Sequence, residues 1–332
     1  MKKIIYIFLM SLFLITGCGK VKDKDVISEV QKKLDQSSGY QLKGELEITN
    51  NDEVYFYDVV VDHKKEDFYK VSLVNQSNQF QQIILKNDDG VFLLTPALNK
   101  SFKFQSDWPY NNSQAYLLDS ILKDIKNDEE HIFTEKNEQY LLETKVNYPN
   151  NSRLSYQKVT FDKEFNLKKV VVYDSNDIVC MEFRVSKVKY SPKYDGDYFD
   201  LDSIINVEEE KDEEVKETSV IEDVIYPLLL PSGTKLVGEE KVSKDFGERV
   251  IMTYDGEKSF LLVEETLDVF DEFTVIPSSG EPFQLMDTIG VMTNNSLSWA
   301  SGNMEYYIVS DVMSREELID VAQSIVGVTS LK

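Results

Sequence analysis

A long alternation of apolar and polar residues constrains the fold of this chain more than any other feature. From residue 40, every second position is apolar or small and charged or amide side chains lie between: Tyr40, Leu42, Gly44, Leu46 and Ile48. A period of two sends successive side chains to opposite faces of a strand, so this segment predicts a strand with one buried face. Similar strands recur to about residue 104, and Asp89–Gly90 is a hairpin signal between two of them. The pattern predicts an antiparallel meander.

Two segments of the first 202 residues carry a helical period instead. Residues 23–34 form one, and residues 113–125 form the other, with an apolar stripe made of Leu117, Leu118, Ile121, Leu122 and Ile125. Strand patterns resume at residues 140–146, 154–161, 167–173 and 178–188. An antiparallel sheet this long must curl. We therefore predict an α+β fold that begins with a curved antiparallel half-barrel whose concave side is covered by helices.

A run of acidic residues divides the chain. EEEKDEEVKE at residues 208–217 lacks apolar periodicity and predicts a solvated linker. After it come short strand patterns and a closing helix, whose start is marked by the capping box Ser314–Glu317. The predicted organisation is a signal peptide at 1–17, a half-barrel domain at 18–202, an acidic linker at 203–219 and a small α+β domain at 220–332.

The N-terminus predicts export. Lys2 and Lys3 precede an apolar run at residues 4–15, which fits a secretory signal and is too short to span a bilayer. The tetrad ITGC that ends at Cys18 resembles a bacterial lipobox, in which the thiol is acylated and becomes the new N-terminus. The resemblance implies diacylglycerol and a palmitate-type acyl group on Cys18. The protein is then expected on the extracytoplasmic face of the cell membrane, anchored by its own lipid.

Charge limits the partners. The net charge of −23 disfavours binding to nucleic acid and to anionic lipid head groups, so membrane attachment must come from the acyl chains. We expect no nucleic-acid partner. With Cys18 used for lipid, the second cysteine, Cys180, has no partner for an internal disulfide.

Motifs for catalysis are not found in the sequence. HExxH, GxSxG, GxGxxG and P-loop patterns do not occur. The Ser-x-x-Lys matches that begin at Ser155, Ser186 and Ser232 fit chance in a chain rich in both residues. The acidic run DGDYFDLD at residues 195–202 lacks the spacing of a calcium-binding loop. We expect no enzyme activity, no catalytic residue, no metal site and no cofactor.

Three stretches together resemble the LolA-like superfamily. They are SSGYQLKGELEI at residues 37–48, NDDGVFLLTPALNKSFKF at 87–104 and VTFDKEFNLKKVVVYDSNDIVCMEFRVSKVKY at 159–190. This superfamily includes lipoprotein carriers, periplasmic regulators of sigma factors, and sporulation or germination lipoproteins of Gram-positive bacteria. The resemblance covers residues 22–202, and residues 299–325 are similar to a module of extracytoplasmic Gram-positive proteins. It implies a half-barrel whose concave apolar face receives an acyl chain or an apolar partner segment.

Aromatic side chains gather in the first sheet region, and together they suit an apolar groove, although each alone fits a filled core better. The groove-lining residues we predict are Tyr40, Leu42, Leu46, Phe68, Phe80, Phe92, Phe102, Phe104 and Trp108. The five apolar residues of segment 113–125 form the predicted lid over this groove.

Two functions stay open from the sequence. The first is a membrane-anchored lipoprotein that binds a lipid, an acyl chain or an apolar peptide, as a carrier or chaperone would. The second is a regulatory protein that senses the state of the envelope during sporulation, germination or stress and contacts an envelope protein. Lipoprotein carriers that shuttle between membranes are soluble, whereas the predicted anchor on Cys18 favours a stationary acceptor or sensor.

Overall fold

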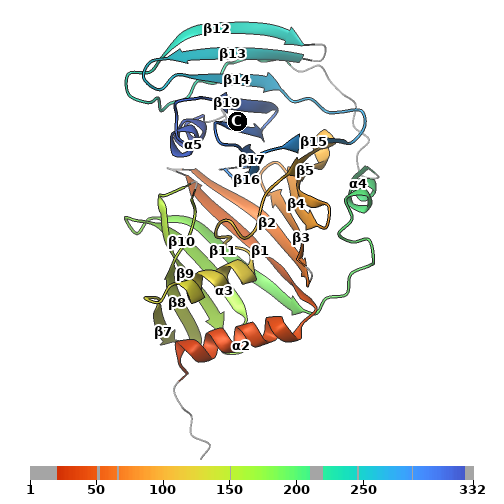
Figure 1. The fold of residues 1–332 in the computed structure, drawn as a ribbon, viewed down its shortest axis with the longest axis vertical. Coiled ribbons are helices and arrows are strands. Elements are labelled where there is room, and N and C mark those ends of the chain that lie inside the picture. The colour runs from red at the N-terminus through yellow and green to blue at the C-terminus, as the bar shows by residue number, and fades with distance from the viewer. Residues whose placement is uncertain are drawn as a thin grey trace, which may run out of the picture.

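In the computed structural model, the described residues are 21–50, 53–65, 67–149, 151–209, 220–244, 247–285 and 287–325. The predicted signal peptide and the predicted lipidation at Cys18 lie outside these residues, and so does segment 210–219 of the predicted linker. The described part is mainly β, with a 12-stranded mixed sheet (sheet A), a 7-stranded antiparallel sheet (sheet B) and a few helices. In Figure 1, sheet A lies in the lower half and sheet B at the top.

The first six strands of sheet A form the predicted meander. They are β1 (Gly39–Asn50), β2 (Glu53–Lys64), β3 (Phe68–Asn75), β4 (Gln81–Asn87), β5 (Gly90–Thr95) and β6 (Lys100–Phe104), with the short 3-10 helix η2 (Pro96–Leu98) before β6. The hairpin predicted at Asp89–Gly90 joins β4 to β5, where Asn87 pairs with Gly90.

The next five strands pair with one another and then with the start of the meander. They are β7 (Ile132–Lys136), β8 (Gln139–Lys145), β9 (Leu154–Asp162), β10 (Leu167–Asp174) and β11 (Val179–Tyr190). Since β11 pairs with β1, the two groups form one antiparallel surface. The pairing shifts register between Lys43 and Gly44. A Cβ on Gly44 would lie 2.3 Å from the Arg184 carbonyl oxygen, so only glycine lets β11 approach at this bulge.

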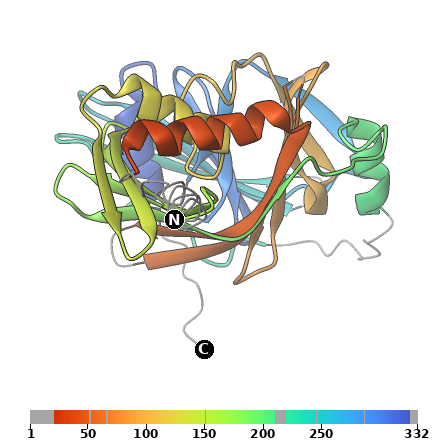
Figure 2. The same ribbon diagram turned by 90° about the horizontal axis from the view of Figure 1, so that it is seen from below.

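Two helices cover the concave face of sheet A. These are α2 (Asp23–Gln36) and α3 (Leu118–Asn127), which both views place side by side across the curved strands (Figure 2). Val26, Val30 and Leu34 of α2 are buried, as the predicted helical stripe requires. They pack into one core with the inward residues of the sheet, among them Leu42, whose position on this face was predicted from the alternation.

The convex face of sheet A is covered at one edge, which the sequence did not suggest. Asp62 of β2 is buried and accepts hydrogen bonds from the hydroxyls of Tyr194 (3.1 Å) and Tyr198 (2.8 Å). Helix α4 (Leu201–Glu209) follows, and Phe199 and Ile204 join a second core with side chains of β4 and β5. The segment 195–202 is therefore held on the sheet by the aromatic side chains within its acidic run, Tyr198 and Phe199.

Sheet B contains the C-terminal strands and packs against one helix. Its strands are β12 (Lys235–Lys244), β13 (Gly247–Asp255), β14 (Phe260–Thr266), β16 (Glu281–Gln284), β17 (Ile289–Met292), β18 (Ser296–Ser301) and β19 (Met304–Val309). Helix α5 (Arg315–Gln323) covers one face of the sheet. The predicted capping box is confirmed: Ser314 Oγ accepts from the Glu317 amide (3.2 Å), and Glu317 accepts from the Ser314 amide (2.8 Å).

Strand β15 (Thr274–Ser278) corrects the prediction of a purely antiparallel first sheet. It pairs in parallel with β6 and forms the edge of sheet A, although it lies in the segment predicted as the C-terminal domain. Helix α4 also runs through the boundary predicted between residues 202 and 203. The two predicted domains therefore share one sheet.

Candidate functional site

A cavity of about 320 Å³ lies where sheet A, sheet B and three loops meet. Its apolar wall on sheet A comes from the ends of β1 and β11 and from β4, through Leu46, Ile48, Ile84 and Met181. Its opposite wall comes from β16, β17 and the turn between them, through Pro282, Phe283, Leu285 and Ile289. Loop residues complete the lining, among them Trp108, Ala115, Tyr148 and Arg153. The site therefore needs both halves of the chain.

Two of the nine predicted groove residues line this cavity. They are Leu46 and Trp108. Tyr40, Leu42 and Phe104 lie on the same face but are buried within the core beneath the helices.

The other four predicted groove residues lie elsewhere. Phe68 and Phe92 point to the convex face, where the ring of Phe68 stacks on Phe199 at 5.9 Å between centroids, so their assignment to the concave face was wrong. Phe80 lies in the β3–β4 connection, outside the cavity lining. Phe102 packs against the first core from β6, away from the cavity.

The five predicted lid residues are packed as core residues. Leu117, Leu118, Ile121, Leu122 and Ile125 are each at most 2% exposed. Helix α3 begins at Leu118, later than the start of the predicted segment, and lies across the concave face between α2 and sheet B (Figure 1). Their role as a lid stays a prediction.

One side of the cavity is joined by buried contacts. The Gln82 side chain reaches from β4 to the start of β17, where its amide nitrogen donates to the Ile289 carbonyl oxygen (2.8 Å). Its amide oxygen accepts from the Ile289 amide (2.6 Å) and the Thr288 hydroxyl (3.0 Å). Ile289 and Val291 also pack into the core of sheet A. We call this set of contacts the buried junction.

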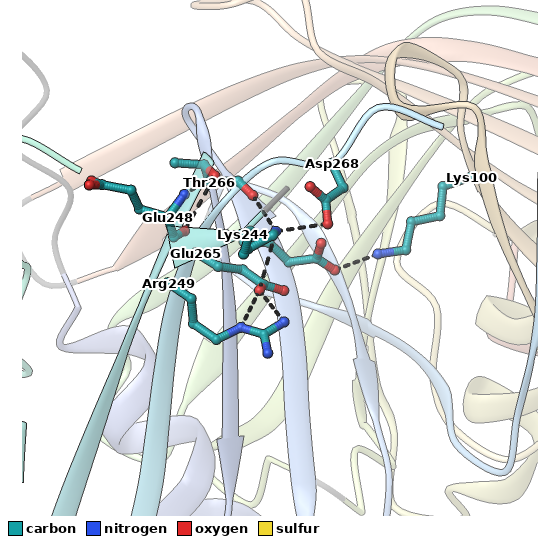
Figure 3. Close-up of polar contacts among 8 residues, drawn as sticks. Lys100, Lys244, Glu248, Arg249, Glu265, Thr266 and Asp268 are labelled. Carbon is teal, nitrogen blue, oxygen red and sulfur yellow. Dashed lines mark hydrogen bonds and ion pairs between the residues drawn. The ribbon is translucent and has the colours of Figure 1, made fainter. Parts of the chain in front are cut away.

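A polar network lies at the same junction, nearer β15. Figure 3 shows Lys100 of β6 beside a carboxylate of sheet B. The carboxylate belongs to Glu305, and its Oε1 lies 2.6 Å from Lys100 Nζ. Lys100 is largely buried, and the Glu305 carboxylate offsets part of the cost of removing its ammonium group from water. Next to it, Glu265 accepts from the guanidinium of Arg249 (2.5 Å) and from the ammonium of Lys244 (3.4 Å). The Lys100–Glu305 pair joins β19 to sheet A, and the contacts of Glu265 join β12, β13 and β14 within sheet B.

On the opposite side of the cavity, the Asn50 side chain donates a part-buried hydrogen bond to the Gln323 carbonyl oxygen (3.4 Å), and the other contacts we describe are exposed. The β8–β9 loop meets α5 there: the Arg153 guanidinium lies 2.7 Å from Asp320, and the Ser152 amide donates to Glu316 (3.3 Å). The Arg153 side chain is 59% exposed. An ion pair this exposed contributes about 0–1 kcal/mol. We call these two contacts of the β8–β9 loop the latch.

The polar groups at the latch side differ in charge. Asp174 accepts hydrogen bonds from the amides of Ile178 and Asn176, both at 2.8 Å, and these bonds lower its pKa. Burial raises the pKa of the half-buried Cys180 thiol, which therefore stays neutral near pH 7. Arg153 is the one cation among the described lining residues.

Sequence reasoning missed most of the lining. Ile48 and Met181 were assigned to buried strand faces but not to the site, and the lining from β16 and β17 was not considered. Their positions at strand ends carry no pattern that separates a cavity wall from a core. No group of His, Cys, Asp and Glu in the described residues could hold a metal ion. None of the described helices is both long and apolar enough to cross a bilayer.

Comparisons with known proteins return a full-length relative. The chain is 36% identical over 323 residues to the sporulation protein YdcC of Bacillus subtilis (strain 168), covering 97% of this chain and 96% of the relative. No family model matches the chain.

Solved structures match weakly. A Pseudomonas aeruginosa MucA/MucB complex is 12% identical with a TM-score of 0.33, covering 91% of this chain and 96% of that chain. A LolA superfamily protein from Nitrosomonas europaea is 10% identical with a TM-score of 0.32, covering 55% of this chain and 100% of that chain. The structure of the CwlD amidase from Clostridioides difficile in complex with the GerS lipoprotein matches with 16% sequence identity and a TM-score of 0.28. The match covers 54% of this chain and 98% of that chain.

Proposed function

The chain belongs to the family of the Bacillus subtilis sporulation protein YdcC, and from this premise we propose that it is a membrane-anchored sporulation lipoprotein that binds a lipid acyl chain. We propose a binding function rather than a catalytic one. The observation that carries the proposal is the cavity of about 320 Å³ with mainly apolar walls between the two sheets. Pockets that hold small ligands begin at about 300 Å³.

An acyl chain suits the walls of this cavity. Leu46, Ile48 and Met181 present branched and flexible apolar side chains on one wall, and Phe283 and Leu285 face them from the other. Each methylene moved from water to such a site contributes about 0.8 kcal/mol. Affinity should therefore rise about fourfold for each added methylene and level off once the cavity is full.

The anchor belongs to the same proposal. Between Cys18 and Asp23, where α2 begins, the chain spans at most about 18 Å, so acyl groups on Cys18 would hold α2 beside the membrane. Replacing Cys18 with alanine should release the protein from the membrane or leave the uncleaved precursor. A variant that stays on the membrane at the processed mass contradicts the anchor.

Photolabelling tests the binding site on the full-length protein in vesicles. A long-chain fatty acid with a photoreactive group near its methyl end should label peptides that contain Ile48 and Met181. Met181→Trp should fill part of the cavity and reduce labelling at least fivefold. Unlabelled fatty acids should compete with the photoreactive one for the site. Their affinity should rise about fourfold with each added methylene until the cavity is full.

A matched substitution controls for general damage. Met304 of β19 is also half-buried but packs against the core of sheet B, outside the cavity lining. Met304→Trp should leave labelling unchanged. Labelling that is spread over the surface, or equal loss in both variants, contradicts an acyl-chain site in this cavity.

A second function, contact with an envelope protein, is favoured by one exposed segment. Tyr226, Leu228 and Leu229 are 45%, 81% and 50% exposed, and the Leu228 amide is fixed by the Ser324 carbonyl oxygen at 3.1 Å. Neighbouring exposed apolar side chains mark contact surfaces. Leu228→Ser combined with Leu229→Ser should remove a co-purifying envelope protein without changing photolabelling. Wild-type protein that purifies alone contradicts this function.

A further inference from the structure

Arg153 is the one cation in the described lining of this cavity, in a chain whose net charge is strongly negative. The net charge is −23, and the cavity lining is otherwise apolar or neutral apart from Asp174. The charge of Asp174 is already satisfied by two backbone amides of its own turn. A single guanidinium at the rim of an apolar cavity is therefore the group that can select among amphiphilic ligands.

The partner of Arg153 holds it from another part of the fold. Asp320 lies on α5, whereas Arg153 lies on the β8–β9 loop, and their ion pair of 2.7 Å closes the latch side of the cavity. Burial raises the pKa of Asp320, and the charges of Glu316 and Glu317 raise it further. The charge of Arg153 acts in the opposite direction and lowers the pKa of Asp320.

We propose that the ligand of this cavity carries an anionic group, a carboxylate or a phosphate, beside its acyl chain, and that this group takes Arg153 away from Asp320. The proposal rests on the acyl-chain function proposed above and specifies its ligand. Guanidinium binds both oxyanions through paired N–H donors, whereas a hydroxyl or ester head group offers only neutral acceptors. The chain would then lie along the apolar walls with its charged end at the rim.

Occupancy would also release the latch. Without Arg153, the first turns of α5 carry Glu316 and Asp320 toward the β8–β9 loop, and the bound anion adds a further negative charge there. Like charges at this distance repel, so the contact between the Ser152 amide and Glu316 should weaken. The buried junction through Gln82 has no charged member and should stay closed. Binding would thus open the cavity on one side only.

Competition on the full-length protein in vesicles tests the charge requirement. The photoreactive fatty acid is displaced by palmitic acid, by lysophosphatidic acid with the same chain, and by hexadecanol as the neutral ligand. Wild type should favour one or both anions over the alcohol by about threefold to tenfold. A preference for palmitic acid alone identifies the carboxylate, and a preference for lysophosphatidic acid alone identifies the phosphate.

Three variants separate the explanations. Arg153→Gln should abolish the preference and leave hexadecanol binding unchanged, whereas Asp320→Asn should strengthen anion binding about threefold or more. Lys145→Gln, which breaks an exposed ion pair with Glu130 outside the cavity lining, should change neither. In wild type, palmitic acid should speed amide exchange of the peptide that contains Ser152, and hexadecanol should not.

The outcomes distinguish the two proposals. If anion and alcohol bind equally while Met181→Trp blocks both, the acyl-chain site stands and the anionic ligand is wrong. An equal loss of both ligands in Arg153→Gln also contradicts it, because the residue would then only shape the cavity. If no amphiphile binds in any variant, the acyl-chain function itself is wrong.

Discussion

The concave face of sheet A is closed differently at its two ends. At the end covered by α2 and α3, apolar side chains pack against one another in one core, and Leu118 and Ile121 are fully buried. At the end near sheet B, side chains from β1 and β11 face β16 and β17 across about 320 Å³ of empty space. The same alternating strands serve both ends. The difference shows that what covers a strand, rather than its own pattern, decides whether its apolar face becomes core or site.

The largest expected effect is at the filled end. Ile121→Ala should lower the free energy of unfolding by about 2–5 kcal/mol, because it removes methylenes from a closed core and leaves a void. Met181→Ala, at the cavity, should cost about 1 kcal/mol or less, because part of its side chain already borders empty space. Urea unfolding followed by circular dichroism measures both. If Ile121→Ala instead strengthened photolabelling without loss of stability, α3 would be the lid predicted from the sequence.

A smaller effect is expected at the buried junction. Its contacts hold the two sheets together on one side of the cavity, which would otherwise be an open cleft. Gln82→Met keeps the size of the side chain but leaves buried polar groups of Thr288 and Ile289 unpaired, at a cost of about 1–3 kcal/mol. Gln76→Met is the matched control on an exposed site and should cost less than about 0.5 kcal/mol. Equal costs would mean that the two sheets are held together elsewhere, with the Lys100–Glu305 pair as the next candidate.

The smallest effect concerns a charge within the filled end. Burial raises the pKa of Asp124 in α3 from its ordinary value of 3.8 to about 6. Between these values Asp124 holds its proton in the folded protein and loses it in the unfolded chain, so the stability that this group contributes is greatest below pH 4 and is lost as the pH rises through 6. Asp124→Asn keeps an acceptor for the Gln157 amide and should stabilise the protein by about 1–2 kcal/mol at pH 7. The gain should vanish at pH 4, and a gain that is equal at both pH values would contradict a buried charge.

The sequence predicted those elements whose pattern has one clear meaning. Helix α2, the meander from β1 to β6 and the capping box at Ser314 are confirmed, because one buried face or one cap determines each. The predicted kinship with sporulation proteins is confirmed by the relative from Bacillus subtilis, which matches 97% of this chain.

Where both faces of a strand are buried, alternation loses its meaning. On β4 and β5, Ile84 and Leu93 point to the first core while Leu85 and Phe92 point to the second. Phe92 was therefore assigned to the wrong face. The cover on that side comes from α4, whose Ile204 stands in a segment dominated by acidic residues and turns. Neither α4 nor the cavity lining from β16 could be predicted, because both depend on contacts between segments far apart in the chain.

The parallel pairing of β15 with β6 has a consequence for the order of folding. During synthesis, strands β1 to β6 can pair with their neighbours early, but the outer edge of β6 stays open until residue 274 is available. An open edge presents unpaired N–H and C=O groups to any other chain, which is a route to aggregation. By pairing with β6, β15 covers this edge within the same chain and keeps other chains from pairing with it. A fragment that ends at residue 202 would keep most of its core and still associate with its own copies through β6.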